Sequence, residues 1–158
     1  MVVSDTSVLI YLIEIGRIDL LQSLTEEVLI PEAVAHELNK GGDTLPPDLK
    51  SLPVRVIQAS EYSTRITEAE SFGLDLGETE AIALALTLDG ALLLIDERKG
   101  REVAKKLGLK FTGLLGVLRV AKLKGRVELI KPFVDELLQL GFRIHPSLYK
   151  SFLQTIGE

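Results

Sequence analysis

The chain has 158 residues, the size of one folded domain, and its 46% hydrophobic and 26% charged residues exclude an intrinsically disordered protein. It contains no cysteine, which excludes disulfides, zinc–thiolate sites, iron–sulfur clusters and cysteine nucleophiles. The first residues lack the charged start and cleavable apolar stretch of a signal peptide, and no apolar run is long enough to span a membrane. We therefore expect a cytoplasmic protein without membrane contact.

Basic and acidic residues are segregated along the chain, although the formal net charge is only −5. Residues 98–131 contain eleven Lys or Arg and two acids, a net charge of +9, whereas the remainder has a net charge of −14. A basic segment in an acidic protein indicates a surface that faces a polyanion. A solvated helix face rich in lysine has the same pattern, so both interpretations stay open.

Short apolar runs alternate with segments of helical periodicity. Strands are predicted at residues 2–4, 28–30, 54–57, 91–95 and 109–112. Helices are predicted at residues 8–15, 18–24, 31–39, 61–72, 77–88, 97–107 and 113–124, then one that ends at residue 140 and a last helical turn from residue 146. Residues 40–53 contain Gly41-Gly42 and Pro46-Pro47 and are predicted to form a loop. The alternation predicts an α/β protein, a three-layer α/β/α sandwich with a central, mostly parallel twisted sheet.

Several common α/β functions are excluded by the residues that follow the strands, where such sheets bind ligands. The first strand is followed by Asp5-Thr6-Ser7 rather than by a glycine-rich dinucleotide-binding turn. The chain contains no P-loop and no G-x-S-x-G nucleophile elbow. Its two histidines, His36 and His145, are too few and too isolated for a histidine-based metal site.

Aspartates stand directly after two apolar strands, Asp5 after residues 2–4 and Asp96 after the most hydrophobic strand of the chain. Two carboxylates at adjacent strand ends repel each other unless a cation lies between them. Oxygen ligands without cysteine or histidine indicate a hard cation, Mg²⁺ or Mn²⁺. Each aspartate could also be a helix N-cap, Asp5 for the first helix and Asp96 for the helix that starts at Glu97.

Four segments resemble, in order and rough spacing, the motifs of PIN-domain nucleases. They are residues 5–10, which open with Asp5, residues 31–38 with Glu37, residues 76–85, and residues 93–109 with Asp96. The resemblance covers residues 2–123, and the Gly-Glu-x-Glu-Ala form of the third segment is similar to the prokaryotic VapC-type toxins. It implies a single PIN-like domain over residues 1–158, with residues 124–158 as a C-terminal helical extension.

The resemblance implies that four acids hold one or two Mg²⁺ or Mn²⁺ ions and cleave single-stranded RNA with an activated water. The catalytic residues it implies are Asp5, Glu37, Glu80 and Asp96. The third acid stays open because Glu78 and Glu80 lie about 200° apart on a helix, so both are kept as candidate metal ligands. The alanine-rich helix after Glu80 favours that residue, whereas Glu78 also fits a capping box with Asp75.

Thr6 and Ser7 are expected to orient a water molecule or Asp5, or to cap the following helix. Arg98, Lys99 and Arg101 come just after Asp96 and are expected to bind RNA phosphates. The family resemblance further implies a homodimer and, for a toxin, an antitoxin protein as partner.

Other functions remain as alternatives. A non-catalytic PIN scaffold that binds RNA or a protein need not keep the acid set, and this chain has all four acids. A haloacid-dehalogenase-like phosphatase requires a second acid two residues after Asp5, where this chain has Ser7. A response-regulator receiver domain requires an acidic pair at the first strand and a lysine at the last, and the chain supplies neither clearly.

Overall fold

The computed structural model describes residues 1–40 and 42–158. Its sheet has the strand order β3-β2-β1-β4-β5, and every pair of neighbours is parallel. The strands are β1 (Val2–Ser4), β2 (Val28–Pro31), β3 (Val54–Ile57), β4 (Leu92–Leu94) and β5 (Lys110–Thr112). From β1 the chain proceeds through β2 and β3 on one side and then through β4 and β5 on the other. The strand order therefore reverses between β1 and β4.

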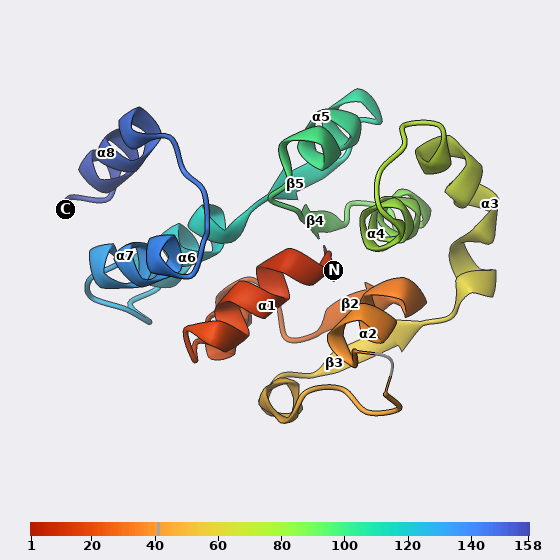
Figure 1. Ribbon diagram of the computed structural model, residues 1–158, viewed down its shortest axis with the longest axis horizontal. Helices are drawn as coiled ribbons and strands as arrows, with labels where there is room; N and C mark the ends of the chain where they lie inside the picture. Colours follow the sequence, from red (N-terminus) through yellow and green to blue (C-terminus); the bar gives the residue numbers. More distant parts are fainter. Residues whose placement is uncertain (41) are drawn as a thin grey trace.

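Helices flank the sheet on both faces (Figure 1), so the expected three-layer α/β/α arrangement is confirmed. The α-helices are α1 (Thr6–Glu14), α2 (Glu32–Leu38), α3 (Ala59–Glu70), α4 (Leu76–Thr87), α5 (Arg98–Lys106), α6 (Leu114–Leu123), α7 (Lys131–Gln139) and α8 (Pro146–Thr155). Two 3₁₀ helices are η1 (Ile18–Ser23) and η2 (Pro47–Ser51). Among the described residues, no helix is both long and apolar enough to span a membrane.

Two segments differ from the sequence-based expectation. The predicted loop at residues 40–53 contains η2, because Pro47 suits the first position of a helical turn and Leu49 is buried in the core. Gly41, which was part of that prediction, lies outside the described residues. The predicted last turn is the full helix α8, whose Phe152 and Leu153 pack inward while the His145 side chain accepts a hydrogen bond from the Ser147 amide.

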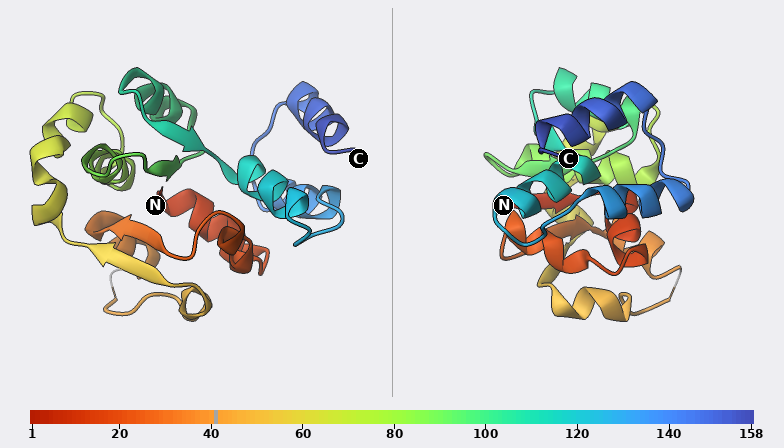
Figure 2. Two further views of the ribbon diagram at one scale, coloured as in Figure 1. Left: turned by 180° about the vertical axis from the view of Figure 1, so that it is seen from behind. Right: turned by 90° about the vertical axis from the view of Figure 1, so that its left-hand side faces the viewer.

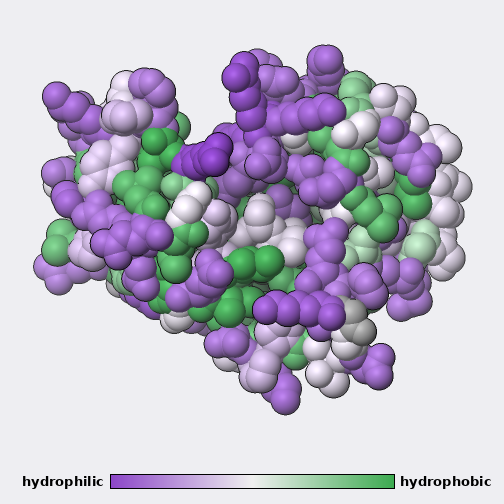
Figure 3. Space-filling model, in the orientation of Figure 1, coloured by the Kyte–Doolittle hydropathy of each residue, from purple (hydrophilic) through white to green (hydrophobic). Residues whose placement is uncertain are grey.

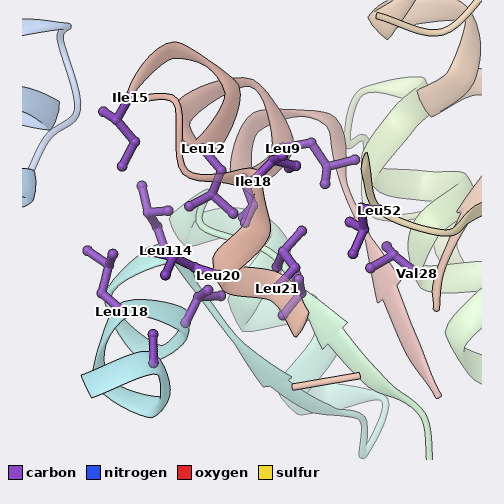
Figure 4. Packing of buried hydrophobic residues seen from close by; sticks show 14 of the residues in the cluster. Leu9, Leu12, Ile15, Ile18, Leu20, Leu21, Val28, Leu52, Leu114 and Leu118 are labelled. Carbon is purple, nitrogen blue, oxygen red and sulfur yellow. The ribbon is translucent and has the colours of Figure 1, made fainter. Parts of the chain in front are cut away.

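Two hydrophobic clusters lie on opposite faces of the sheet because successive strand residues point to opposite sides. Val2 belongs to the cluster with α1, η1 and α6, and its neighbour Val3 to the cluster with α4 and α5. Figure 4 shows the first cluster, in which side chains of α1 and η1 pack against Leu114 and Leu118 of α6. Burial on both faces explains why β2 and β4, in the interior of the sheet, are continuously apolar.

The C-terminal helices extend the molecule at the end opposite α3, as Figure 1 and the left view of Figure 2 show. The Glu158 carboxylate accepts hydrogen bonds from the Ile130 amide (2.8 Å), the Lys131 amide (2.9 Å) and Lys122 Nζ (2.7 Å). Burial acts to raise the pKa of Glu158, but Lys122 and the two amides outweigh it and lower that pKa. These contacts bind Glu158, which follows the end of α8, to α6 and to the start of α7.

Candidate active site

Asp5 lies at the end of β1, next to the point where the strand order reverses. Parallel α/β sheets bind their ligands at this place. The Asp5 side chain is buried. Its Oδ1 accepts a hydrogen bond from the Val8 amide (3.1 Å), and its Oδ2 accepts one from Ser7 Oγ (3.0 Å). Asp5 is therefore the N-cap of α1, and it lies beside the reversal point of the strand order.

Asp96 follows β4 on the other side of the reversal point. Both of its carboxylate oxygens lie 3.1 Å from the Leu114 amide, so Asp96 caps α6 and not the helix that starts beside Glu97. The N-cap residue of α6 is Gly113, which has no side chain to cap the helix itself. A Cβ at Gly113 would overlap Asp96 Oδ1, so glycine is required for this approach.

Glu37, on the second half of α2, extends toward the start of α4. Its carboxylate packs against Gly77, where a Cβ would lie 2.7 Å from both carboxylate oxygens. Thr6 Oγ1 donates a hydrogen bond to Glu37 Oε2. Thr6 thus orients Glu37 on the neighbouring helix, while Ser7 orients Asp5.

Glu78 occupies the first turn of α4 and is buried. Its backbone amide donates to Asp75 Oδ1 (2.8 Å), which forms one half of the expected capping box. Glu78 Oε1 is buried and has no hydrogen-bond partner among the described residues. It faces Gly100 of α5, where a Cβ would lie 3.0 Å from Oε1.

Asp5, Glu37 and Glu78 border a cavity of about 140 Å³ at the carboxyl end of the sheet, whereas Asp96 does not line it. The cavity is lined by Asp5, Thr6, Ser7, Ile10, Glu37, Asp75, Glu78 and Glu97. Asp75 and Glu97 were not predicted as site residues, because the sequence explains each as part of a helix start. The signal that could have found them is their place beside a predicted acid, Asp75 three residues before Glu78 and Glu97 next to Asp96.

Glu80 does not line this cavity. Its Oε2 accepts hydrogen bonds from the Tyr62 hydroxyl (2.7 Å) and from the Ala33 amide in the first turn of α2 (2.9 Å). Two positions along a helix turn the side chain by about 200°, so α4 directs Glu78 and Glu80 to different neighbours. The structure brings Glu78 to the cavity of Asp5 and Glu37, and Glu80 to the start of α2.

The three predicted phosphate ligands have different surroundings. Arg98 pairs with Glu102 (3.1 Å) on the exposed face of α5, and Lys99 Nζ donates to the Gly73 carbonyl (3.1 Å). Arg101 lies 3.9 Å from Asp96 Oδ1. Arg98, Arg101 and Asp96 line a second, larger groove of about 660 Å³, and Lys99 does not.

A family model described as a PIN domain matches residues 1–158. The chain belongs to the PIN-domain family. The resemblance seen in the sequence is thereby confirmed at the level of the family, whose members are in general nucleases, a class of hydrolases. A search of curated proteins and a search of solved structures found no match.

Burial is the main cause of the raised pKa of three carboxyl groups in this PIN domain. Burial raises the pKa of Asp5 to about 7, the Val8 and Ser7 hydrogen bonds oppose this, and the charges of Asp96 and Glu78 add to it. Burial raises the pKa of Glu78 to about 7 as well, with a further contribution from Asp75. Burial also raises the pKa of Asp96, against the Leu114 amide and Arg101. The site concentrates negative charge that a cation would relieve.

The free energy of unfolding of the PIN domain in a chelating buffer is expected to fall as the pH rises from about 4 to about 7. The folded state holds protons on Asp5 and Glu78 that the unfolded state releases at lower pH, so ionisation favours unfolding in this window. Urea titrations at a series of pH values measure the effect. Asp5→Asn should flatten the curve, and an unchanged pH dependence in this variant would contradict the assignment.

The side chains around the cavity fit a hard divalent cation in kind. Every lining donor is a carboxylate or hydroxyl oxygen, the ligand type that Mg²⁺ and Mn²⁺ prefer. The buried Glu78 Oε1 without a partner is an acceptor that a cation would satisfy. Within residues 1–40 and 42–158, no three acidic side chains are close enough to share one ion, so joint binding requires side-chain rotation.

Proposed function

We propose that this PIN domain hydrolyses phosphodiester bonds in single-stranded RNA with Mg²⁺ or Mn²⁺ as its cofactor. The observation that carries the proposal is the meeting of Asp5, Glu37 and Glu78, from α1, α2 and α4, around one cavity where the strand order reverses. Asp5 and Glu78 are buried, and no basic side chain lines the cavity, which is costly for folding; Glu37 is exposed and adds a third carboxylate beside them. Such a cost is characteristic of a functional site rather than of a structural ion pair.

Asp5, Glu37, Glu78 and Asp96 are the residues we propose as ligands for one or two ions. A bound divalent ion would acidify a water molecule and neutralise charge on the phosphoryl oxygens. Glu80, which the sequence favoured as the third acid, is assigned a positioning role instead. Its carboxylate holds the first turn of α2, the helix that carries Glu37.

Hydrogen bonds and close packing position the carboxylates of the proposed site. Ser7 holds Asp5, Thr6 holds Glu37, and the glycines at 77, 100 and 113 allow three carboxylates to pack closely against backbone. A water molecule attacks phosphorus and the bond from phosphorus to the 3′ oxygen breaks, which leaves a 5′-phosphate and a 3′-hydroxyl. No side-chain nucleophile is needed, which agrees with the lack of a candidate in the sequence.

The cleavage assay is direct. The purified chain is expected to cut a labelled single-stranded RNA with Mg²⁺ or Mn²⁺, to lose this activity in a chelating buffer, and to regain it when the metal is restored. Gel electrophoresis of the labelled products measures the rate and the new ends. RNA that stays intact with either metal would overturn the proposal and favour the alternative of a non-catalytic PIN scaffold.

We further propose that the nuclease is the toxin of a toxin–antitoxin pair and acts on RNA in the cytoplasm as a homodimer. The form of residues 76–85 supports the toxin assignment through its similarity to VapC-type proteins. Leu123 and Leu129 are 75% and 56% exposed at the end of α6 and just beyond it. Apolar surface of this kind supports a contact with a second copy or with an antitoxin.

A further inference from the structure

A wide groove lies between the central sheet and the C-terminal helices. This groove, of about 660 Å³, has α5 and β5 on one side and residues 142–144 and α8 on the other, with the start of α6 between them. Figure 3 shows the surface hollowed between α8, at upper left, and α5, at the top. The two walls are separated by more than thirty residues of sequence, so the groove exists only in the folded chain.

The groove is strongly basic. Five cations line it, Arg98, Arg101, Lys105, Arg119 and Arg143, against two acids, Asp96 and Glu102. Arg98 is paired with Glu102. Lys105, Arg119 and Arg143 form no ion pair with any described residue, and all three are exposed. Their charges are thus available to an anionic ligand.

Six apolar side chains also line the groove: Phe111, Leu115, Phe142, Ile144, Leu148 and Phe152. The three phenylalanines are half-buried, and Leu148 is 52% exposed. Arg101 stacks over the Phe111 ring at 5.2 Å. Phe142 packs edge-on against Tyr11 of α1, with ring centroids 5.3 Å apart. These contacts hold the wall of the groove in place and leave ring surface beside the cations.

The groove lies beside the acidic site. Asp96 lines the groove, and its neighbour in the chain, Glu97, lines the smaller cavity. A strand with one phosphate at the acids would therefore place its neighbouring nucleotides in the groove. We infer that the groove between α5, α6 and α8 binds the single-stranded RNA next to the scissile phosphate, with phosphates on Arg119 and Arg143 and bases against the phenylalanines. This inference rests on the proposed function.

Single-stranded nucleic acid matches the groove better than an acidic protein segment does. Proteins that bind single-stranded nucleic acids combine a positively charged groove for the phosphate backbone with aromatic side chains on which bases stack, and the lining of this groove has both. Asp96 lies at one end of the basic wall, and its carboxylate would repel an acidic peptide. An RNA strand would not be repelled in this way if a cation lay between its phosphate and Asp96. The basic stretch predicted from the sequence supplies four of the five cations, and Arg143 of the extension supplies the fifth.

The test measures binding without catalysis. A fluorescent RNA of about 12 nucleotides is titrated with the full chain in a chelating buffer, and anisotropy is recorded at several salt concentrations. The double variant Arg119→Gln/Arg143→Gln is expected to bind about 10-fold more weakly. The slope of the logarithm of the binding constant against the logarithm of the salt concentration should decrease in magnitude by about 1.4, because two phosphate contacts are lost. Phe152→Leu keeps an apolar side chain but removes a ring, so it should weaken RNA binding several-fold and leave heparin binding unchanged.

The matched control is Lys124→Gln/Arg126→Gln, which removes the same charge from two exposed residues of the basic segment outside the groove. It should bind within about 2-fold of the unmodified chain. RNA binding by the groove variant with unchanged affinity and slope would overturn the inference, and is the result expected if the groove takes an acidic protein segment. Weakened RNA binding together with no metal-dependent cleavage would support the groove while the proposed hydrolysis fails.

Discussion

Asp5→Asn is expected to lower metal-dependent RNA cleavage by at least about 100-fold while the protein stays folded. Asparagine keeps an oxygen for the Val8 amide, so the cap of α1 remains. It removes a buried carboxyl group whose pKa is raised to about 7, and so it removes a charge that opposes folding at neutral pH. The melting temperature at about pH 8 should therefore be equal to or higher than that of the unmodified chain.

Asp89→Asn is the matched control. Asp89 is exposed in the turn before β4, at the end of the sheet opposite Asp5, and this variant should keep full activity. Initial rates at saturating metal and a thermal melt of each variant provide the comparison. Full metal-dependent cleavage by Asp5→Asn would remove the catalytic assignment, and a large drop in its melting temperature would mean that Asp5 serves mainly as a structural cap.

The strand ends of the site could be predicted from the sequence. A strand buried on both faces has a continuous apolar run, and an aspartate directly after such a run stands at the sheet edge where α/β proteins bind ligands, whether or not it also caps a helix. Asp5 and Asp96 both follow runs of this kind. Parallel pairing then brings the two strand ends to one edge, and the observed strand order places them on either side of the reversal point.

The helix residues of the site could not be predicted in the same way. Which face of α4 meets the cavity depends on how α4 packs against α2 and α3, and this packing is not encoded in the local pattern around Glu78 and Glu80. The cap that Asp96 provides for α6 spans 18 residues of sequence. The partner of Thr6 is Glu37, 31 residues away. Contacts at such separations appear only when the tertiary structure is known.

The roles of three glycines at the site could not be predicted from the sequence either. A Cβ at Gly77 would press against the Glu37 carboxylate, and one at Gly113 against the Asp96 carboxylate. A Cβ at Gly100 would meet Ile95 Cδ1 at 2.5 Å and Glu78 Oε1 at 3.0 Å. In the sequence they look like ordinary residues near helix starts. Their positions have meaning only together with the acids that pack on them, so a change to alanine at any of the three would displace one proposed ligand.

Glu78→Gln and Glu80→Ala are expected to have opposite effects, which separates the two candidates for the third acid. Glu78 has a raised pKa of about 7 and a carboxylate oxygen without a partner. Glutamine at this position should lower cleavage by about 100-fold and leave the free energy of unfolding unchanged or higher. Glu70→Gln, a change on the exposed face of α3, is the control for both measurements.

Glu80→Ala leaves the buried Tyr62 hydroxyl and the Ala33 amide without their shared acceptor. The loss should cost about 2–4 kcal/mol of stability, because each unpaired buried group costs about 1–3 kcal/mol. Tyr62→Phe keeps the hydrogen bond from the Ala33 amide to Glu80. It removes the bond from Tyr62 to Glu80 and the one that the Glu32 amide donates to the Tyr62 hydroxyl (3.2 Å), and it provides a second variant if Glu80→Ala does not fold. Burial raises the pKa of Tyr62, with a further contribution from Glu80, so its hydroxyl keeps its proton and donates to Glu80.

Activity per folded molecule decides between the two acids. Tyr62→Phe and Glu80→Ala should keep more than about a tenth of the activity, since Glu80 acts on the catalytic cavity only through the position of α2. Urea denaturation gives the folded fraction, and the cleavage rate is divided by it. A Glu80 variant that stays folded but loses activity as completely as Asp5→Asn would show that Glu80 is a ligand after all. The loss of activity in Glu78→Gln would then have to come from the first turn of α4 and not from a missing ligand.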